Sequence, residues 1–182
     1  AVLFLALAAT ASTEQAREML RKPYVVGRHM YSNGVRANTD VARFNQEGYL
    51  AKTLWVMPEE RAAWAQMDAA APVPPPSSPP GSAASSLPSP APAKSTQSLV
   101  LARGELMLRG QCMACHTLDD YRSLRRLLSG RDREAIGNIL AMLHEAKDDS
   151  PYKSYMPPLA GATPEINALG DYLATLTALA SP

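Results

Sequence analysis

Cysteine, aromatic residues and net charge are all scarce in this chain of 182 residues. Its only two cysteines lie close together, at Cys112 and Cys115, so no structural disulfide can form without consuming both. Phe, Trp and Tyr make up only 6% of the residues. The formal net charge is +1, without the basic field that nucleic-acid binding requires. We therefore exclude nucleic acid as a partner.

The chain also lacks a long hydrophobic run. Its apolar beginning, Ala1–Ala9, is far shorter than the roughly 20 residues that a helix needs to cross a bilayer core. Two interpretations of residues 1–12 remain. They are the remnant of a signal peptide, with Ala9–Ala11 resembling a cleavage site, or the end of a transmembrane helix whose beginning is missing.

Proline, in contrast, is abundant and unevenly placed. Nine of the 16 prolines lie between Pro72 and Pro92, where almost every other residue is Ala or Ser. This composition predicts a disordered linker over residues 69–97, extended by up to about 3.1 Å per residue. It separates a membrane-proximal segment, 13–68, from a C-terminal domain, 98–182.

The segment before the linker shows few folding signals. A short helix is expected over Thr13–Arg21, continuing the apolar run and ended by Pro23. A turn is expected at Ser32–Gly34 and a second short helix over Asn45–Trp55. Because the segment offers too little apolar surface for a core of its own, we expect it to pack on something absent from the chain.

After the linker, the pattern predicts three helices and no strand. The first covers Ser98–Gln111, where the small residue Gly104 permits a close helix crossing. The second covers Arg131–Ala146, with apolar residues at helical spacing. The third begins with Thr163 as N-cap and Pro164 at its first position. The whole chain is therefore predicted to be all-α.

A group of arginines lies between the first of these helices and the first turn of the second. Because leucines alternate with them, a solvated helix face is the preferred interpretation, and a docking surface for an acidic redox partner is the alternative. The arginines are Arg122, Arg125, Arg126, Arg131 and Arg133.

The chemistry of the chain is concentrated in the sequence Cys-Met-Ala-Cys-His. Two thiols at this spacing can each add to one vinyl group of a haem, and the next residue then presents an imidazole to the iron. Cys112 and Cys115 are therefore predicted to anchor one covalent haem c, with His116 as its axial ligand. A porphyrin would also supply apolar volume to a domain of about 85 residues, which buries little surface by itself.

Two other sites could use the same residues. A zinc site needs four ligands, and beyond the two cysteines only His116 and His144 are available in this domain. A thioredoxin-like pair needs a βαβ context, which the pattern lacks. Haem c is therefore the preferred interpretation.

The second axial ligand has four candidates: Met107, Met142, His144 and Met156. Met156 precedes Pro157 and Pro158, which forbid helix and place it on an extended loop just before the last helix. The other three lie in predicted helices, where core packing or a rim position is the simpler interpretation. We choose Met156, and ligation by His and Met would raise the reduction potential.

With these motifs together, residues 98–180 resemble a class I cytochrome c domain. The resemblance implies that the first and last helices cross near the haem edge and that this edge exchanges electrons with partners. It departs from the family at Leu108, where an aromatic residue is common. The matching features are Gly104, Cys112–His116, Met156–Pro158 and Tyr172.

Residues 14–36 carry a second resemblance, to the C-terminal end of subunit I in relatives of bd-type quinol oxidase. It consists of Arg17–Val26 and His29–Gly34, and none of that family's haem ligands can be mapped here. His29 is interpreted as a surface or interfacial histidine. Some of these relatives carry a fused cytochrome c domain.

The function expected from both resemblances is electron transfer by a haem c domain tethered to a membrane respiratory complex. Its partners would be a membrane respiratory subunit and a periplasmic redox protein, with the haem domain on the periplasmic side of a bacterial cell membrane. No catalytic residue is expected. The alternatives are an anchored, free-standing periplasmic cytochrome c, or a haem-based sensor or peroxidase with an open iron site.

Overall fold

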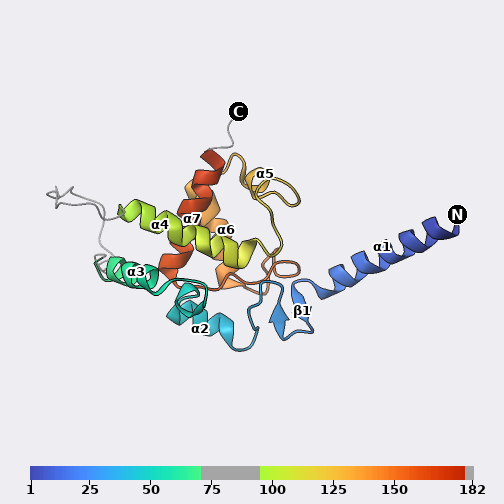
Figure 1. Ribbon diagram of the computed structural model, residues 1–182, viewed down its shortest axis with the longest axis horizontal. Coiled ribbons are helices and arrows are strands. Elements are labelled where there is room, and N and C mark those ends of the chain that lie inside the picture. Colours follow the sequence, from blue (N-terminus) through green and yellow to red (C-terminus); the bar gives the residue numbers. More distant parts are fainter. Residues whose placement is uncertain (71–94, 179–182) are drawn as a thin grey trace.

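The computed structural model describes residues 1–70 and 95–178, and in this part the chain is mostly helical, as predicted (Figure 1). Residues 71–94 of the predicted linker lie outside the described residues. The α-helices are α1 (Val2–Arg21), α2 (Asp40–Glu47), α3 (Pro58–Ala70), α4 (Thr96–Met107), α5 (Leu124–Leu128), α6 (Arg133–Glu145) and α7 (Thr163–Ala178).

Helix α1 projects from the rest of the molecule as a single rod (Figure 1). As predicted, it joins the apolar run to the segment before Pro23. Its first two turns are highly exposed, with Leu3 at 73% and Phe4 at 75% of full exposure. The hydroxyls of Thr10 and Ser12 bond back to carbonyls four residues earlier. Among the described residues, no helix combines the length and apolarity needed to cross a membrane.

A small hairpin that was not predicted follows α1. Strands β1 (Tyr24–Val26) and β2 (Met30–Tyr31) pair antiparallel, and the rings of Tyr24 and Tyr31 stack with their centroids 4.6 Å apart. The predicted turn after β2 is confirmed, because the Gly34 N–H bonds to the Tyr31 carbonyl at 2.9 Å. The backbone of Gly34 has a φ of +80°, which glycine adopts readily.

The helix predicted over Asn45–Trp55 is wrong in its position. The chain instead forms α2, which ends at Gly48, and then a single 3-10 turn, η1 (Leu50–Lys52). Gly48 has a φ of +92°, a conformation that interrupts a helix, so no helix can continue through it. Helix α2 begins at Asp40, an acid whose side chain is buried.

Helices α4 and α7 cross in the middle of the molecule (Figure 1). A Cβ atom placed on Gly104 would lie 2.1 Å from the Ala168 carbonyl oxygen and 2.6 Å from the Tyr172 Cβ atom. The two backbones therefore meet where α4 has no side chain. This confirms the expectation that Gly104 permits a close helix crossing.

The segment before the linker packs on the helices after it, which corrects the expectation that its partner lies outside the chain. On α3, the Trp64 indole N–H bonds to the Leu99 carbonyl at 3.2 Å, and Asp68 pairs with Arg103 at 2.9 Å. One hydrophobic core unites the two parts. From the first part it contains Val35, Phe44, Tyr49, Leu50, Val56 and Trp64, and from the second Met107, Leu108, Ile136, Leu140, Leu169 and Leu173, among others.

Replacement of Gly104 tests the crossing. We expect Gly104→Ala to lower the free energy of unfolding by about 2–3 kcal/mol, because the methyl group can fit only if the two helices move apart. Urea unfolding of the full chain measures the change. In the control Gly137→Ala, also inside a helix, the new methyl would meet only the end of the Arg133 side chain. Similar losses in both variants would contradict the close crossing.

Candidate functional site

The two cysteines and the histidine of the motif lie on one tight turn at the end of α4. The helix first widens into a π-helical turn, η2 (Leu108–Cys112), a local form that occurs often at functional sites. The carbonyl of Cys112 then accepts hydrogen bonds from the N–H groups of Cys115, at 3.1 Å, and His116, at 3.0 Å. The fold thus brings together the three residues predicted to hold a haem.

The imidazole of His116 is oriented by the backbone. Its Nδ1 atom lies 2.9 Å from the carbonyl oxygen of Arg122, and the ring is half-buried. Because a carbonyl only accepts hydrogen bonds, Nδ1 carries the proton, and the Nε2 atom of the neutral ring keeps a free lone pair. A bond from the other ring nitrogen to a carbonyl is the usual way in which proteins orient a metal-binding histidine.

The two thiols are half-buried and unpaired with each other. Burial, together with the neighbouring Cys115 thiol, raises the pKa of Cys112 to about 12. Cys112 is therefore a protonated thiol at neutral pH, whereas metal ligation and disulfide exchange both use the thiolate. The sulfur of Cys115 lies 3.5 Å from the Ser32 hydroxyl, which belongs to the segment after β2.

Zinc would need further ligands near these thiols. Within residues 1–70 and 95–178, no three His, Cys, Asp or Glu side chains are grouped so that they could hold a metal ion.

A cavity of about 400 Å³ lies beside the motif, between it and the segment that contains α1 and the hairpin. This volume falls in the range of small-molecule and cofactor sites. The side of the motif supplies Met113, Ala114, Cys115, His116, Thr117, Tyr121 and Arg122, and the opposite side supplies Arg17, Lys22, Tyr24, Val25 and Ser32.

Met156 lies on the expected non-helical loop but is not among the residues that line this cavity. Its N–H bonds to the Tyr152 carbonyl at 2.8 Å, and its side chain is half-buried. The loop is held next to the motif by Gln111, whose amide oxygen accepts the Ala160 N–H at 3.0 Å and whose amide nitrogen donates to the Ala160 carbonyl. The Cα of Met156 thus lies within about 15 Å of the Cα of Ala160, since four peptide units separate them.

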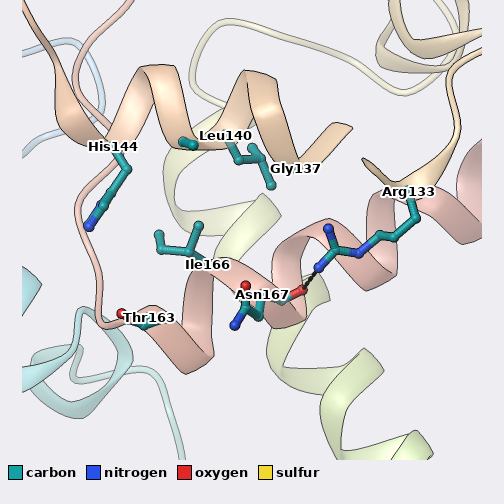
Figure 2. Close-up of a pocket in the computed structure, with 8 residues that line it drawn as sticks. Arg133, Gly137, Leu140, His144, Thr163, Ile166 and Asn167 are labelled. Carbon is teal, nitrogen blue, oxygen red and sulfur yellow. Dashed lines mark hydrogen bonds between the residues drawn. The ribbon is translucent and has the colours of Figure 1, made fainter. Parts of the chain in front are cut away.

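His144 lies in a different place from the motif. Together with Leu140 on α6 it faces Ile166 on α7 across a second cavity, of about 190 Å³ (Figure 2). Its Nδ1 atom is 2.9 Å from the Leu159 carbonyl. Neither the cysteines nor His116 line this cavity.

The burial of the two other candidate methionines, and of His29, can be compared with the predictions. Met107 is fully buried, as expected of a core residue. The core position predicted for Met142 is wrong, because its side chain keeps 39% of its full exposure on the outer side of α6. His29 is exposed, in agreement with the surface interpretation.

Glu165 is a buried acid that the sequence reasoning missed as an organising residue. Its carboxylate accepts the N–H groups of Tyr49 at 2.7 Å, Leu50 at 2.9 Å and Ala162 at 2.9 Å. Since the Ile166 N–H bonds to the Ala162 carbonyl, the N-cap of α7 is Ala162, one residue before the predicted cap. A Glu three residues after a cap was the available signal, because its side chain can bond back to the cap N–H.

Other residues that shape the site gave no sequence signal. The Tyr49 hydroxyl donates to the Gly110 carbonyl at 3.2 Å, and the Tyr49 ring lies where a Cβ of Gly110 would be. Ser32 and Gln111 contribute the contacts described above. Tyr49, Ser32 and Gln111 each contact a residue far away in the sequence, so a local sequence pattern cannot predict these contacts.

Comparison with models of known protein families, with curated proteins and with solved structures found no match for this chain.

Replacement of Glu165 tests its role in joining the two halves of the chain. We expect Glu165→Ala to lower the free energy of unfolding by about 3 kcal/mol or more, because three buried N–H groups lose their acceptor. Urea unfolding measures the loss, and hydrogen exchange should accelerate at the Tyr49 and Leu50 amides. The control is Glu134→Ala, an exposed acid in the first turn of α6. Equal losses in both variants would refute this role.

Proposed function

We propose that this protein transfers single electrons through one covalent haem c, bound by thioethers to Cys112 and Cys115 and ligated by His116. The observation that carries the proposal is the Nδ1–H of His116 bonded to the Arg122 carbonyl, on the same turn as both thiols. This bond leaves Nε2 free to bind iron. When bound, haem c would supply one-electron oxidation and reduction at its iron.

The state of the thiols supports this chemistry over its rivals. Burial raises the pKa of Cys112 to about 12, which is unfavourable for a thioredoxin-like nucleophile, and the described residues hold no group of ligands that could complete a zinc site. A low pKa is the usual property of a reactive cysteine in a redox pair.

The helical frame supports a class I cytochrome c arrangement. That resemblance implies a crossing of the first and last helices of the domain, and α4 and α7 cross at Gly104 against Ala168 and Tyr172. The motif follows directly from the crossing helix through η2.

Met156 is the second axial ligand in this proposal. Gln111, next to Cys112, holds Ala160 by two hydrogen bonds and so keeps the methionine loop close to the motif. His144 is the weaker candidate, since it bonds to Leu159 and lines the second cavity. Met107 is committed to the core, where it is fully buried.

We further propose that the domain works as a tethered relay in a bd-oxidase-like membrane respiratory complex, with a periplasmic redox protein as its other partner. The exposed apolar turns of α1 support an association with the membrane on the N-terminal side. Attachment of haem c outside the cytoplasmic membrane of bacteria supports a periplasmic haem domain. The identity of the complex rests on the resemblance of residues 14–36 alone.

One observation favours a second candidate, a haem-based sensor or peroxidase. Met156 does not line the cavity that contains His116, so in this arrangement the sixth iron position would be open to a small ligand. The two candidates differ in a measurable property, the coordination of the iron.

The first experiment tests the cofactor. Expressed in cells that mature c-type cytochromes, the full chain should give a pyridine haemochrome spectrum of haem c that remains with the protein after denaturation. We expect His116→Ala to lose at least about nine-tenths of this holoprotein, because the iron loses its oriented ligand. His144→Ala is the matched control and should retain it. A His116→Ala protein with normal haem content would refute the assignment.

The second experiment tests the distal ligand. Met156→Ala should keep the covalent haem, lose the sulfur-to-iron charge-transfer band and show a lower reduction potential, because His and Met ligation raises the potential. Met142→Ala, an exposed methionine on α6, should change neither.

An unchanged spectrum in Met156→Ala would exclude Met156 as the ligand. A wild-type protein that is five-coordinate and binds carbon monoxide would favour the sensor or peroxidase instead.

A further inference from the structure

The loop after the proposed methionine ligand is held by hydrogen bonds at consecutive residues. The Leu159 N–H donates to the Leu143 carbonyl at 3.0 Å, and the Leu159 carbonyl accepts the Nδ1–H of His144 at 2.9 Å. The next residue, Ala160, is bonded twice to the side-chain amide of Gln111. All of these partners belong to the part of the chain after the linker, in α6 and η2.

Gly161, the following residue of the loop, is held from the segment before the linker. Its N–H donates to the Oδ1 atom of Asn45, on α2, at 3.0 Å. The Asn45 side chain is half-buried, so this bond is partly shielded from water. A Cβ atom placed on Gly161 would lie 2.9 Å from a Glu165 carboxylate oxygen and 2.9 Å from the Met107 Cε atom, so the loop lies directly against the core here. A side chain 116 residues earlier in the sequence thus fixes one point of this loop.

A constraint at Gly161 is transmitted to Met156 because the residues between them are stiff. The rings of Pro157 and Pro158 fix the φ angles of both residues. The hydrogen bonds described above restrict the two residues that follow. Little torsional freedom remains along this stretch, so a displacement of Gly161 also displaces the methionine.

The position of the methionine matters because a thioether is a neutral, weak ligand of iron. Binding through such a ligand is strengthened when the protein holds it in place beforehand, since less freedom is lost when the bond forms. Groups that orient a ligand without touching the metal often affect metal binding strongly for this reason.

We infer that Asn45 is a positioning residue for Met156, so that the segment before the linker helps to set the strength of the sulfur–iron bond. This inference rests on the proposed function. It gives the packing of α2 against the loop a role at the iron, in addition to its role in the fold.

The experiment uses the full-length holoprotein. The test variants are Asn45→Leu, which keeps the branched shape of the side chain without its acceptor, and Asn45→Ala, which removes the acceptor and adds no bulk. The control is Trp64→Phe. It also removes one hydrogen bond between the two parts of the chain, but at the Leu99 carbonyl in the first turn of α4, at the end of that helix away from Gln111.

Free imidazole is the probe, because it competes with the methionine sulfur for the ferric iron and abolishes the sulfur-to-iron charge-transfer band. We expect both Asn45 variants to keep covalent haem and to bind imidazole about three- to tenfold more tightly than the wild type, the factor that corresponds to one hydrogen bond. Amide hydrogen exchange should accelerate at Gly161 in both variants. The imidazole affinity of Trp64→Phe should stay close to the wild-type value.

Two outcomes would overturn the inference while leaving the proposed function intact. One is an unchanged imidazole affinity in either Asn45 variant. The other is an equal gain of affinity in Trp64→Phe, which would indicate general destabilisation. Absence of covalent haem in the wild type would instead remove the proposed function, and a charge-transfer band that persists in Met156→Ala would remove its distal ligand; the inference would fall with either.

Discussion

The contact between the backbones of α4 and α7 is the constraint on which the rest of the fold depends. It requires a residue without a side chain at Gly104, and it sets where the end of α4 comes to lie against the core. The π-helical turn that follows α4 ends at Cys112, and His116 lies on the tight turn after it. The position of the proposed cofactor ligands thus follows from one close helix crossing, and the Arg122 carbonyl then fixes the direction of the imidazole.

The segment before the linker shares one hydrophobic core with this frame and is also joined to it by a few specific polar contacts. The Glu165 carboxylate, at 1% of full exposure, satisfies two N–H groups of the first segment and one at the start of α7. A carboxylate buried at this depth is tolerated because its acceptor sites are used. Trp64 and the Asp68–Arg103 pair secure the same two halves farther along α4. The two parts on either side of the proline-rich stretch therefore form a single packed unit.

The parts of the structure that local patterns could predict are those with local causes. Helical spacing and end signals located α4, α6 and α7 to within a few residues, and two prolines correctly excluded helix after Met156. The helix expected over Asn45–Trp55 failed because the conformation of Gly48 overrides the local pattern. Gln111, Ser32 and the bonds of Glu165 to Tyr49 and Leu50 were missed because their partners lie between about 50 and 116 residues away along the chain, and no short window contains both members of such a pair.

The high pKa of Cys112 has a consequence for the life of the chain before any cofactor is attached. In the periplasmic location proposed for this domain, two cysteines at this spacing would be prone to close an internal disulfide, and a disulfide cannot add to a vinyl group. Oxidation proceeds through attack by a thiolate, and with a pKa of about 12 the Cys112 thiolate is a minute fraction at neutral pH. In the proposed function, Cys112 would therefore not be the thiol that starts this oxidation in the folded apoprotein.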